Sequence, residues 1–272
     1  AFRAKVVRNG GIYRPFNKQL CGGATSGCVE HGKMVIVDAK AVLLSTGNFD
    51  SSSLCDRAQN PKNCDRDYAY IIHYAPAIQV LGQIFERDLD GRPYDLKSIL
   101  KRPGAADLTV SPYSLPPLVD LIDSARSSID IPAQYLKDPK MNAAILAAAK
   151  SGVKVRINVA SVCFFGKPSK GEATKWENTY SELEAAGAQI RVFTKNIHIG
   201  GVEGYLHAKA IVVDGRTAWV GSVNGSTQAL GSNREFGVFF DGARDVQSLL
   251  RFMNGDFGNR NGESWQESLA CR

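Results

Sequence analysis

Residues 31–48 read HGKMVIVDAKAVLLSTGN, and residues 207–224 read HAKAIVVDGRTAWVGSVN. A histidine, a lysine, an aspartate and an asparagine occur in the same order in both stretches, each displaced by 176 positions. The pairs are His31 and His207, Lys33 and Lys209, Asp38 and Asp214, and Asn48 and Asn224. Four polar matches at one displacement do not arise by chance. The chain therefore contains an internal repeat, and this repeat decides the fold.

The repeat continues downstream, with a change of displacement that marks an insertion. The further matches lie 168 positions apart, so the first copy carries eight extra residues between Asn48 and Asp67. These matches are Asp67 with Glu235, Ile78 with Val246, Leu81 with Leu249, Ile84 with Phe252 and Asp88 with Asp256. Upstream, the strand-like residues 4–8 match residues 190–194, which gives the first copy ten extra residues before its histidine.

The second copy also contains a region that the first copy lacks. Residues 109–188 predict alternating strands and helices, including a helix at 141–151 that follows Pro139 and stops at Gly152. A parallel strand is expected at 153–160, a second helix at 174–186 and another strand at 189–193. Nothing upstream of the first motif can match this region. We therefore expect a shortened N-terminal half, in a chain that is a fragment, a processed form or one piece of a longer protein.

Together these patterns predict an α/β protein made of two pseudo-symmetric α/β/α sandwich halves. Residues 1–95 are assigned to the C-terminal part of the first half, 96–108 to a connector and 109–272 to the second half. Residues 90–107 show turn signals and too few core positions for a regular element. Equivalent helices are expected at 77–89 and 244–257, where apolar residues recur at helical spacing.

Each motif brings together residue types that suit a phosphate diester. The histidine and lysine lie two positions apart on a predicted strand, so both side chains point to the same side. A second strand, at 41–44 or 217–220, returns and delivers a small polar residue, Thr46 or Ser222, and then the asparagine. Two facing hairpins would supply one imidazole to attack phosphorus, another to protonate the leaving oxygen, and cations to stabilise the charge. With these cations built in, no metal and no other cofactor is expected.

On these residues the chain resembles the phospholipase D superfamily, whose HxKxxxxD signature, followed by a glycine, a serine or threonine and an asparagine, occurs twice in one polypeptide. The resemblance covers about residues 4–89 and 109–257. The second copy matches throughout, with Gly221 and Ser222, whereas the first has Ser45 and Thr46 at those positions. The resemblance implies halves of phospholipase D type and a metal-independent hydrolase or transphosphatidylase that acts through a phosphohistidine.

The resemblance also implies roles for individual residues. One histidine becomes phosphorylated and the other serves as acid and then base; we expect His31 to be the nucleophile and His207 the acid/base. The phosphate would be held by Lys33, Lys209, Asn48 and Asn224, with Thr46 and Ser222 as further substrate-binding residues. An acidic residue beyond the asparagine orients a histidine through its other ring nitrogen, and Asp67 and Glu235 fill that position. We expect Asp67 to serve His31. Asp38 and Asp214 are expected to be structural.

The six cysteines predict disulfides and an oxidising compartment. Two closely spaced pairs lie in the extra segments of the first copy, which favours local bridges over crossed pairing, and the remaining two would form a third bridge. The local pairs are Cys21 with Cys28 and Cys55 with Cys64, and the third is Cys163 with Cys271. CxxC spacing is absent, which argues against zinc. The expected location is secreted or periplasmic.

The motifs predict a reaction type, whereas the substrate follows from weaker signals. Hydrophobic residues in loops around the expected site favour a phospholipid at a membrane surface: Tyr13, Phe16, Leu20, Phe164 and Phe165. Basic residues in flanking loops support the alternative of a nuclease acting on DNA or RNA: Arg57, Lys62, Arg66, Lys167, Lys170 and Lys175. A non-catalytic phosphate-binding module is the alternative of another class, and the intact histidines disfavour it.

Composition sets the outer limits of these interpretations. The chain is 44% hydrophobic and 22% charged, which is typical of a globular protein and excludes general disorder. It contains no apolar run of about 18 residues that would predict a membrane span. The net charge of +6 is spread along the chain, and Lys33 and Lys209 account for part of it. The charge therefore supports phosphodiester chemistry without favouring nucleic acid. The partners expected are a phospholipid surface, or nucleic acid as the alternative, and a missing N-terminal segment or second chain that completes the first half.

Overall fold

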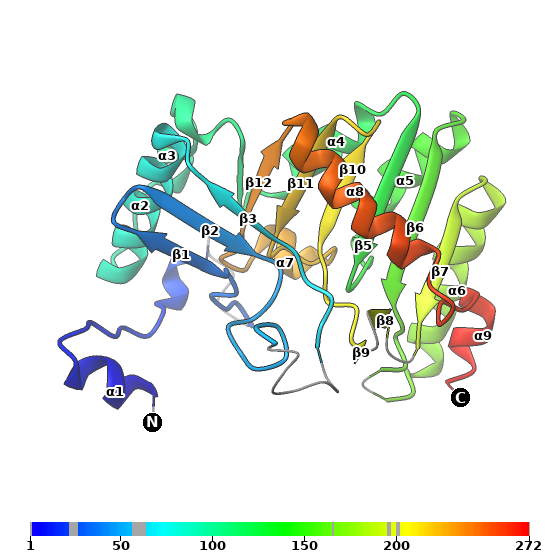
Figure 1. Cartoon of the computed structure of the whole chain (residues 1–272), viewed down its shortest axis with the longest axis horizontal. Coiled ribbons are helices and arrows are strands. Elements are labelled where there is room, and N and C mark those ends of the chain that lie inside the picture. The colour runs from blue at the N-terminus through cyan, green and yellow to red at the C-terminus, as the bar shows by residue number, and fades with distance from the viewer. Residues whose placement is uncertain are drawn as a thin grey trace.

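The structure is a computed structural model of residues 1–272, and it describes residues 2–21, 27–55, 64–164, 166–194, 197–199 and 202–271. A seven-stranded sheet and a three-stranded sheet lie side by side, with helices packed on their faces (Figure 1). A small two-stranded sheet is formed by β8 (Ile197–Ile199) and β9 (Val202–Gly204). The α/β class predicted from the sequence is confirmed.

The seven-stranded sheet belongs to the second half of the chain. Its strands, in spatial order, are β4 (Leu108–Val110), β12 (Phe236–Phe240), β11 (Thr217–Gly221), β10 (Ala210–Val213), β5 (Ser128–Ala133), β6 (Lys154–Ala160) and β7 (Gln189–Phe193). β5, β6 and β7 run parallel, and the other neighbours are antiparallel. The central strands are apolar runs buried on both faces, as expected where helices cover a sheet on both sides.

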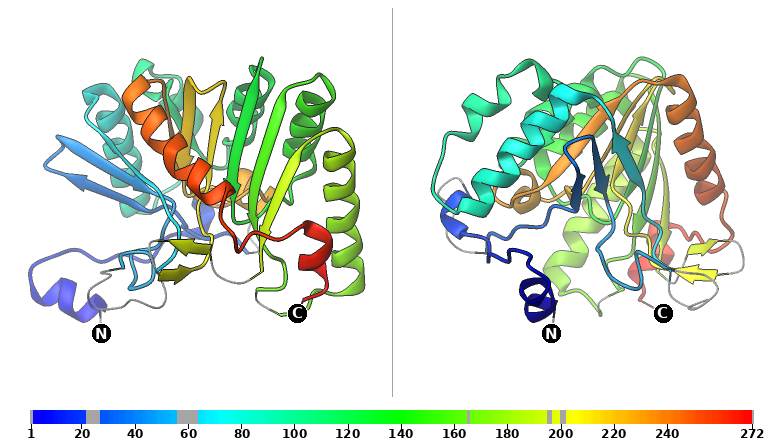
Figure 2. Two further views of the ribbon diagram at one scale, coloured as in Figure 1. Left: turned by 45° about the vertical axis from the view of Figure 1, so that its right-hand side comes forward. Right: turned by 60° about the vertical axis from the view of Figure 1, so that its left-hand side comes forward.

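Helices cover both faces of this sheet (Figure 2). α4 (Leu115–Asp123), α5 (Pro139–Lys150) and α6 (Lys170–Ala185) share one apolar core with the sheet, and α8 (Ala243–Phe257) covers the opposite face. The predicted helix at 141–151 begins at Pro139, because the Asp138 side chain accepts hydrogen bonds from the first-turn amides. The helix expected at 174–186 begins earlier, at Lys170, because Ser169 and Glu172 form a capping box.

The three-stranded sheet belongs to the first half. β1 (Met34–Val37), β2 (Ala41–Ser45) and β3 (Ala69–Ile72) are antiparallel, and α2 (Ala75–Asp90) packs against one face. The core between them includes Val42, Leu44 and Ile72 and extends to β12 and β4 of the other sheet. The helices expected at 77–89 and 244–257 are therefore both present and occupy equivalent positions.

Two predictions about the first half were wrong. The strand expected at 4–8 is the helix α1 (Phe2–Arg8), whereas its supposed match at 190–194 overlaps β7, which pairs with β6. α1 pairs with no strand among the described residues, and a short exposed segment gains little from an extended conformation without such pairing. The connector also contains regular structure, namely α3 (Leu96–Leu100) and the 3-10 turn η2 (Pro103–Ala105). The Asp95 side chain caps α3, and Leu96 and Ile99 are buried against α2.

The remaining elements are short. They are the 3-10 turn η1 (Lys18–Leu20), α7 (Thr227–Gly231) and α9 (Trp265–Leu269). Across the described part of the chain, no helix combines the length and apolar character that crossing a membrane requires.

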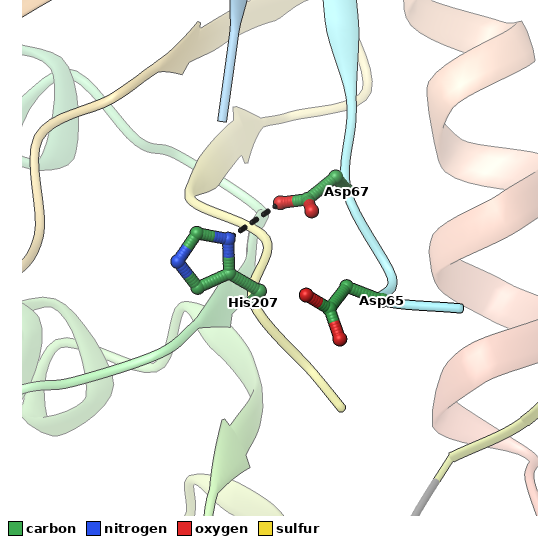
Figure 3. A group of neighbouring side chains, drawn as sticks. All are labelled: Asp65, Asp67 and His207. Carbon is green, nitrogen blue, oxygen red and sulfur yellow. Dashed lines mark hydrogen bonds and ion pairs between the residues drawn. The ribbon is translucent and has the colours of Figure 1, made fainter. Parts of the chain in front are cut away.

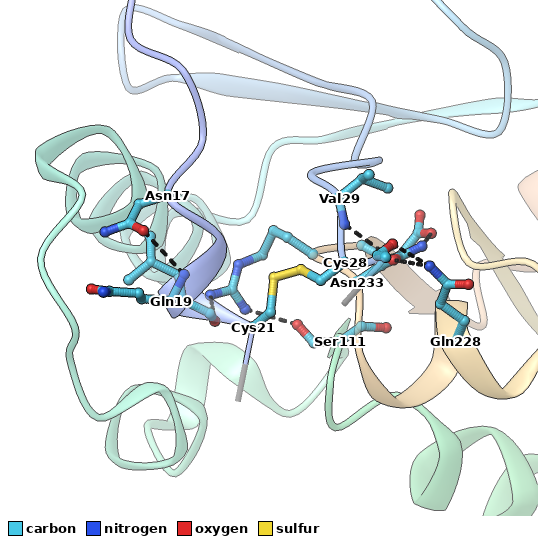
Figure 4. Close-up of a disulfide and its surroundings, with 12 residues drawn as sticks. Asn17, Gln19, Cys21, Cys28, Val29, Ser111, Gln228 and Asn233 are labelled. Carbon is cyan, nitrogen blue, oxygen red and sulfur yellow. Dashed lines mark hydrogen bonds between the residues drawn. A yellow bond between two sulfur atoms is a disulfide. The ribbon is translucent and has the colours of Figure 1, made fainter. Parts of the chain in front are cut away.

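All six cysteines are paired as the sequence predicted: Cys21 with Cys28, Cys55 with Cys64, and Cys163 with Cys271. The first bridge lies beside the segment that leads to His31 (Figure 4). The Asn233 side chain accepts a hydrogen bond from the Val29 amide, and Gln228 donates to the Gly27 carbonyl. These hydrogen bonds hold the segment after the disulfide against the loop that carries Glu235.

Candidate active site

The two motif histidines lie just before β1 and just before β10, at the junction of the two halves. Each is held by a backbone hydrogen bond to the other half. The His31 amide donates to the Arg234 carbonyl at 2.9 Å, and the His207 amide donates to the Arg66 carbonyl at 3.1 Å. The two contacts are related by the displacements found in the sequence, so the pseudo-two-fold symmetry holds at the level of single hydrogen bonds.

Each histidine is paired with a carboxylate from the opposite half. His31 Nδ1 lies 3.0 and 2.9 Å from the two carboxylate oxygens of Glu235, and His207 Nδ1 lies 3.0 Å from Asp67 Oδ1. The expectation that Asp67 serves His31 was therefore wrong. Because the segments before each histidine and each carboxylate pair across the junction, the carboxylate of one copy reaches the imidazole of the other.

Several hydrogen bonds orient Asp67, and Figure 3 shows the one that it makes with His207. The Thr46 hydroxyl donates to Asp67 Oδ1 at 2.7 Å and accepts a hydrogen bond from the Tyr68 amide. Burial alone would raise the pKa of Asp67, but the hydrogen bond and charge of His207, together with Lys209, hold it below its usual value. Asp67 is therefore ionised at neutral pH, and its partner Nδ1 carries the proton. This arrangement leaves Nε2 of His207 free for chemistry.

A hydrogen bond from a neighbouring side chain likewise orients the carboxylate of Glu235. Asn233 donates to one of its oxygens at 3.1 Å, and the Glu235 side chain is fully buried. The two imidazoles differ in exposure, since the His31 side chain is 30% exposed and the His207 side chain only 8%. Burial also lowers the pKa of His207, which favours its neutral form in the absence of a bound anion.

Both motif lysines are buried at the junction. Lys33 donates to the His31 carbonyl at 2.5 Å, and Lys209 donates to the carbonyls of His207 and, at 3.2 Å, Thr46. Burial lowers the pKa of Lys33 to about 8 and that of Lys209 to about 7. Two cations confined in this way have little access to water. They would gain strongly from a nearby anion.

The asparagines and hydroxyl residues of the motifs occupy different environments. Asn224 is buried, and its Oδ1 has no hydrogen-bond partner, nor does Asp67 Oδ2. Asn48 is partly exposed, and its amide donates to Ser53. Thr46 and Ser222 are fully enclosed, and the Ser222 hydroxyl is hydrogen-bonded to the Phe236 backbone. Their hydroxyls position protein groups, and the expected contact with substrate stays a prediction.

Asp214 has the structural role that the sequence suggested. It accepts hydrogen bonds from the backbone amides of residues 126–128, which lead into β5. Burial would raise its pKa, but these amides and the Ser127 hydroxyl lower the pKa to about 2. Asp38 occupies the equivalent place after β1 with the same left-handed backbone, φ 50° against 53° for Asp214. It is exposed.

Two buried ion pairs behind the dyads were not predicted. Arg234 Nε lies 2.8 Å from Asp88 Oδ2, and Arg66 lies 2.8 Å from Asp256 Oδ1. Each arginine precedes a dyad carboxylate and pairs with the acidic residue near the end of the helix of the opposite half. The signal was present in the sequence, because Arg66 and Arg234 share the displacement of 168 positions with the acidic residues.

Asp65, Asp67 and His207 are the described residues whose geometry comes nearest to a metal site. Their potential ligand atoms lie within 4.8 Å of one another (Figure 3). The His207 Nδ1 proton, however, is engaged by Asp67, and a metal ligand must be an unprotonated nitrogen about 2.0–2.1 Å from a zinc ion. The contact is therefore a histidine–carboxylate dyad.

Aromatic side chains adjoin the His207 side of the site. The Phe164 and Tyr205 rings pack with centroids 4.0 Å apart, and Tyr205 lies 6.2 Å from the His207 ring. Tyr13 and Phe16 line a cavity of about 360 Å³ between the N-terminal loop and α2, whereas Leu20 is buried.

The basic residues named for nucleic acid differ in their surroundings. Arg66 is engaged with Asp256, so it is not free to follow a phosphate backbone. Lys167, Lys170 and Lys175 are exposed. Phe165, Arg57 and Lys62 lie outside the described residues.

Comparison with known proteins finds relatives of the second half of the chain. Residues 118–257 match the family model described as cardiolipin synthase, PLD-like domain. A cardiolipin synthase from Listeria welshimeri is 30% identical over 133 residues, which are 48% of this chain and 25% of the relative. The chain thus spans about a quarter of the length of the curated relatives it matches.

Two solved structures share the fold. Phosphatidylserine synthase from Haemophilus influenzae superposes with a TM-score of 0.58 at 16% identity, covering 88% of this chain and 64% of the other. Polyphosphate kinase from Porphyromonas gingivalis superposes with a TM-score of 0.55 at 15% identity, covering 83% of this chain and 32% of the other. These similarities concern the arrangement of the elements in space.

Proposed function

The chain belongs to the phospholipase D superfamily, and we propose that it is a phosphodiesterase that hydrolyses or transfers the phosphatidyl group of phospholipids through a phosphohistidine. One observation carries the proposal. The pseudo-two-fold junction presents two histidine–carboxylate dyads from opposite halves, with a buried lysine beside each histidine. A double-displacement reaction at phosphorus needs one nucleophile, one proton donor and cations for the equatorial oxygens, and this set supplies all three.

In the first step we assign the attack to His31. Its imidazole is the more exposed of the two, so its Nε2 can approach phosphorus while Glu235 stabilises the positive charge that develops on the ring. The P–O bond to the leaving alcohol breaks, and His207 Nε2 gives its proton to that oxygen. The negative charge of the bound phosphodiester favours the protonated form of His207, which its buried site otherwise disfavours.

In the second step the incoming water or alcohol loses its proton to His207 and attacks the phosphohistidine. The P–N bond breaks, His31 leaves as a neutral imidazole, and the product carries the new P–O bond. Lys33 and Lys209 hold the phosphoryl oxygens throughout, with Asn48 and Asn224 as further donors. Thr46 and Ser222 support these residues, since Thr46 orients Asp67 and Ser222 is hydrogen-bonded to the backbone of Phe236, the residue after Glu235. The cations of the site are side chains, so we propose a reaction that is independent of metal ions.

Phospholipid is the favoured substrate for two reasons. Curated relatives of this chain, such as the one from Listeria welshimeri, are named cardiolipin synthases. In addition, Phe164 is 39% exposed beside Tyr205 and His207, so an apolar surface borders the reacting group. The three disulfides favour an oxidising compartment, and we place the protein outside the cytoplasm, secreted or periplasmic.

The experiment compares three substrates with one protein and one variant. The chain and His207→Ala are incubated with phosphatidylglycerol vesicles, single-stranded DNA and an aryl phosphodiester, with and without EDTA. We expect lipid turnover that EDTA leaves unchanged, that a primary alcohol diverts to transfer, and that His207→Ala abolishes. Cleavage of DNA without cleavage of lipid would instead assign a nuclease, and absence of turnover on every substrate would favour a phosphate-binding module.

A trapping experiment tests the histidine roles. An activated aryl phosphodiester, labelled at phosphorus and with a leaving group that needs no protonation, is mixed with His207→Ala, which should accept the phosphoryl group on His31 and release it slowly. Label should be retained as acid-labile phosphohistidine, and the further change His31→Ala should remove it. Label that persists in the double variant would show that neither histidine carries the phosphoryl group. Label absent from His207→Ala but retained in His31→Ala would reverse the assignment.

A further inference from the structure

Asp256, near the C-terminal end of α8, holds both chain neighbours of the dyad carboxylate Asp67. Its Oδ1 accepts a hydrogen bond from the Arg66 guanidinium at 2.8 Å, and its Oδ2 accepts one from the Tyr68 hydroxyl at 3.0 Å. Asp256 is only 3% exposed. One buried carboxylate therefore fixes the residues on either side of another, and the reaction proposed above assigns it no part.

The alternation of side chains along an extended segment explains why these contacts matter for Asp67. Residues 66–68 lead into β3, and side chains two positions apart in such a segment point to the same side. Arg66 and Tyr68 accordingly both reach α8. Asp67, between them, points to His207 (Figure 3). A rotation of the segment that broke either contact with the helix would also turn Asp67 away from the imidazole.

Arg66 also positions the main chain of the histidine. Its amide donates to the Tyr205 carbonyl at 2.7 Å, and its carbonyl accepts the His207 amide at 3.1 Å. The guanidinium and the main chain of one residue thus connect α8 to the segment that carries His207. Both members of the second dyad, His207 and Asp67, are therefore linked through Arg66 to the same buried carboxylate.

The first dyad, His31 with Glu235, is supported in the same way on one side. Arg234 forms an ion pair with Asp88 of α2, with Nε 2.8 Å from Oδ2, and its carbonyl accepts the His31 amide at 2.9 Å. Its own amide donates to the Val29 carbonyl at 3.0 Å. In both dyads an arginine of one half therefore holds together the histidine segment and the helix of the other half.

The two supports differ at the residue after the dyad carboxylate. Tyr68 has its counterpart in Phe236, and phenylalanine has no hydroxyl to donate. Asp88 accepts a hydrogen bond instead from Tyr94, a residue beyond the end of α2, at 2.8 Å. The geometry of the first dyad therefore depends on one flanking contact, and that of the second dyad on two.

Burial makes these ion pairs geometric constraints. The Arg66 and Asp256 side chains are 14% and 4% exposed, and those of Arg234 and Asp88 are 2% and 11% exposed. A buried ion pair adds little net stability over apolar packing, but removing one partner leaves an uncompensated charge, so the pair keeps its arrangement. In an active site, a shift of about 1 Å in a positioned group lowers the rate by about 10²-fold.

We propose that Asp256 is a positioning residue for the second dyad. Through its two flanking contacts it holds the dyad carboxylate and the histidine main chain in the geometry that proton transfer by His207 requires. Asp256 acts through these residues and is not itself a reacting group. This inference rests on the acid/base role proposed above for His207.

Asp88 acts equivalently on the nucleophile, so loss of the two aspartates should have different consequences. Without Asp256, the steps in which a proton moves at His207 should slow. Without Asp88, the attack of His31 on phosphorus should slow, whatever the leaving group is.

Two aryl phosphodiesters that differ in the leaving group separate these effects. Departure of phenol needs a proton from His207, whereas departure of dinitrophenol needs none, and kcat/KM reports the step in which either one leaves. Asp256→Asn should lower kcat/KM for the phenyl ester about 30- to 100-fold and for the dinitrophenyl ester less than about threefold. Asp88→Asn should lower both by a similar factor, because both substrates share the attack on phosphorus.

Asp130→Asn serves as the control for a broken ion pair. Asp130 pairs with Arg156 at 2.5 Å, and Arg156 also donates to Asn254 of α8, so this variant breaks a similar pair beside the same helix and outside both dyads. It should change kcat/KM for either ester less than about threefold. Tyr68→Phe copies the residue of the other half and should cause a milder loss, confined to the phenyl ester. Thermal unfolding verifies that each variant is folded at the assay temperature.

Nitrogen NMR of the histidine rings gives a readout that needs no turnover. In Asp256→Asn the Nδ1 proton of His207 should exchange with solvent faster than in the unaltered chain, whereas that of His31 should exchange at an unchanged rate. If the unaltered chain cleaved neither ester, the proposed function would fail. The faster exchange at His207 would still support the positioning role of Asp256.

Three results would overturn the proposal. One is an equal loss on both esters in Asp256→Asn, which a purely structural role would produce. Another is an unchanged kcat/KM for the phenyl ester in the same variant. The third is an Nδ1 proton of His207 that exchanges at the same rate in Asp256→Asn and in the unaltered chain.

Discussion

Replacing Asp67 with asparagine tests how the site holds His207. The change removes the negative charge opposite Nδ1 but keeps the size of the side chain. In the structure the Tyr68 amide donates to the Thr46 hydroxyl, so that hydroxyl must donate its own proton to the atom at Oδ1. An amide at position 67 is therefore forced to place its oxygen at Oδ1 and its nitrogen at Oδ2. The His207 Nδ1 proton keeps its acceptor, and the tautomer is preserved.

The expected loss of kcat/KM follows from this geometry. What Asp67→Asn removes is the charge of a buried hydrogen bond, 3.0 Å long, which is worth about 1.5–3 kcal/mol. At about 1.4 kcal/mol for each factor of ten, kcat/KM should fall roughly 10- to 150-fold. Adding Thr46→Val frees the amide to rotate and present its nitrogen to Nδ1. The wrong tautomer then dominates, and the total loss should approach about 10⁴-fold.

The assay combines kinetics on an aryl phosphodiester with nitrogen NMR of the histidine rings. The matched control is Asp65→Asn, which removes a neighbouring carboxylate whose charge is the smallest of the influences on the pKa of His207, and it should change kcat/KM less than about threefold. NMR should show the Nδ1–H tautomer of His207 retained in Asp67→Asn and lost in the double variant. The reasoning fails if Asp67→Asn perturbs the His31 resonances instead, or if the single and double variants are equally impaired.

Three further outcomes are expected. Burial lowers the pKa of Lys209 to about 7 and that of Lys33 to about 8, so the cationic forms are lost in that order as pH rises. The value of kcat/KM should therefore begin to fall above about pH 7 and fall further above about pH 8, and a flat profile to pH 9.5 would contradict this role. Gly221→Ser should lower the free energy of unfolding by about 1–3 kcal/mol in urea titrations, because a Cβ there would lie 2.6 Å from the Phe236 carbonyl oxygen; an unchanged midpoint would show that the backbone yields. Asp88→Asn leaves the buried Arg234 guanidinium without a counter-charge, so it should lower the free energy of unfolding by about 3 kcal/mol in the same titration. A change below about 0.5 kcal/mol would show that Arg234 does not need the charge of Asp88.

The repeated motif could be predicted from the sequence because each copy lies within one short stretch of the chain. His31 and Lys33 alternate along one extended stretch, and the helices that start at Pro139 and near Arg244 are marked by caps and helical spacing. The local disulfides were readable for the same reason, since each pair lies within one short loop. The superfamily and the α/β class follow from such local signals repeated at a constant displacement.

The pairing of groups across the junction was decided only by the tertiary structure. Sequence spacing placed Asp67 in the same copy as His31, but parallel backbone contacts between the halves carry it to His207 and carry Glu235 to His31. The ion pairs Arg66–Asp256 and Arg234–Asp88 were not predicted for the same reason. A repeat shows which residues are equivalent, whereas the symmetry operation that brings the copies together determines which residues meet.

Failures of local prediction have the same origin. Residues 4–8 resemble a strand in sequence, but an extended segment is stable only when a neighbouring strand satisfies its amides and carbonyls, and none of the described strands does so. Leu96 and Ile99 lie in a segment rich in turn residues, yet they form a helix because α2 offers an apolar surface to cover. The sequence by itself determined the residue types, the repeat and the chemistry they allow. The packing of one half against the other decided which carboxylate serves which histidine, because side-chain contacts depend on distances in space that sequence separation does not specify.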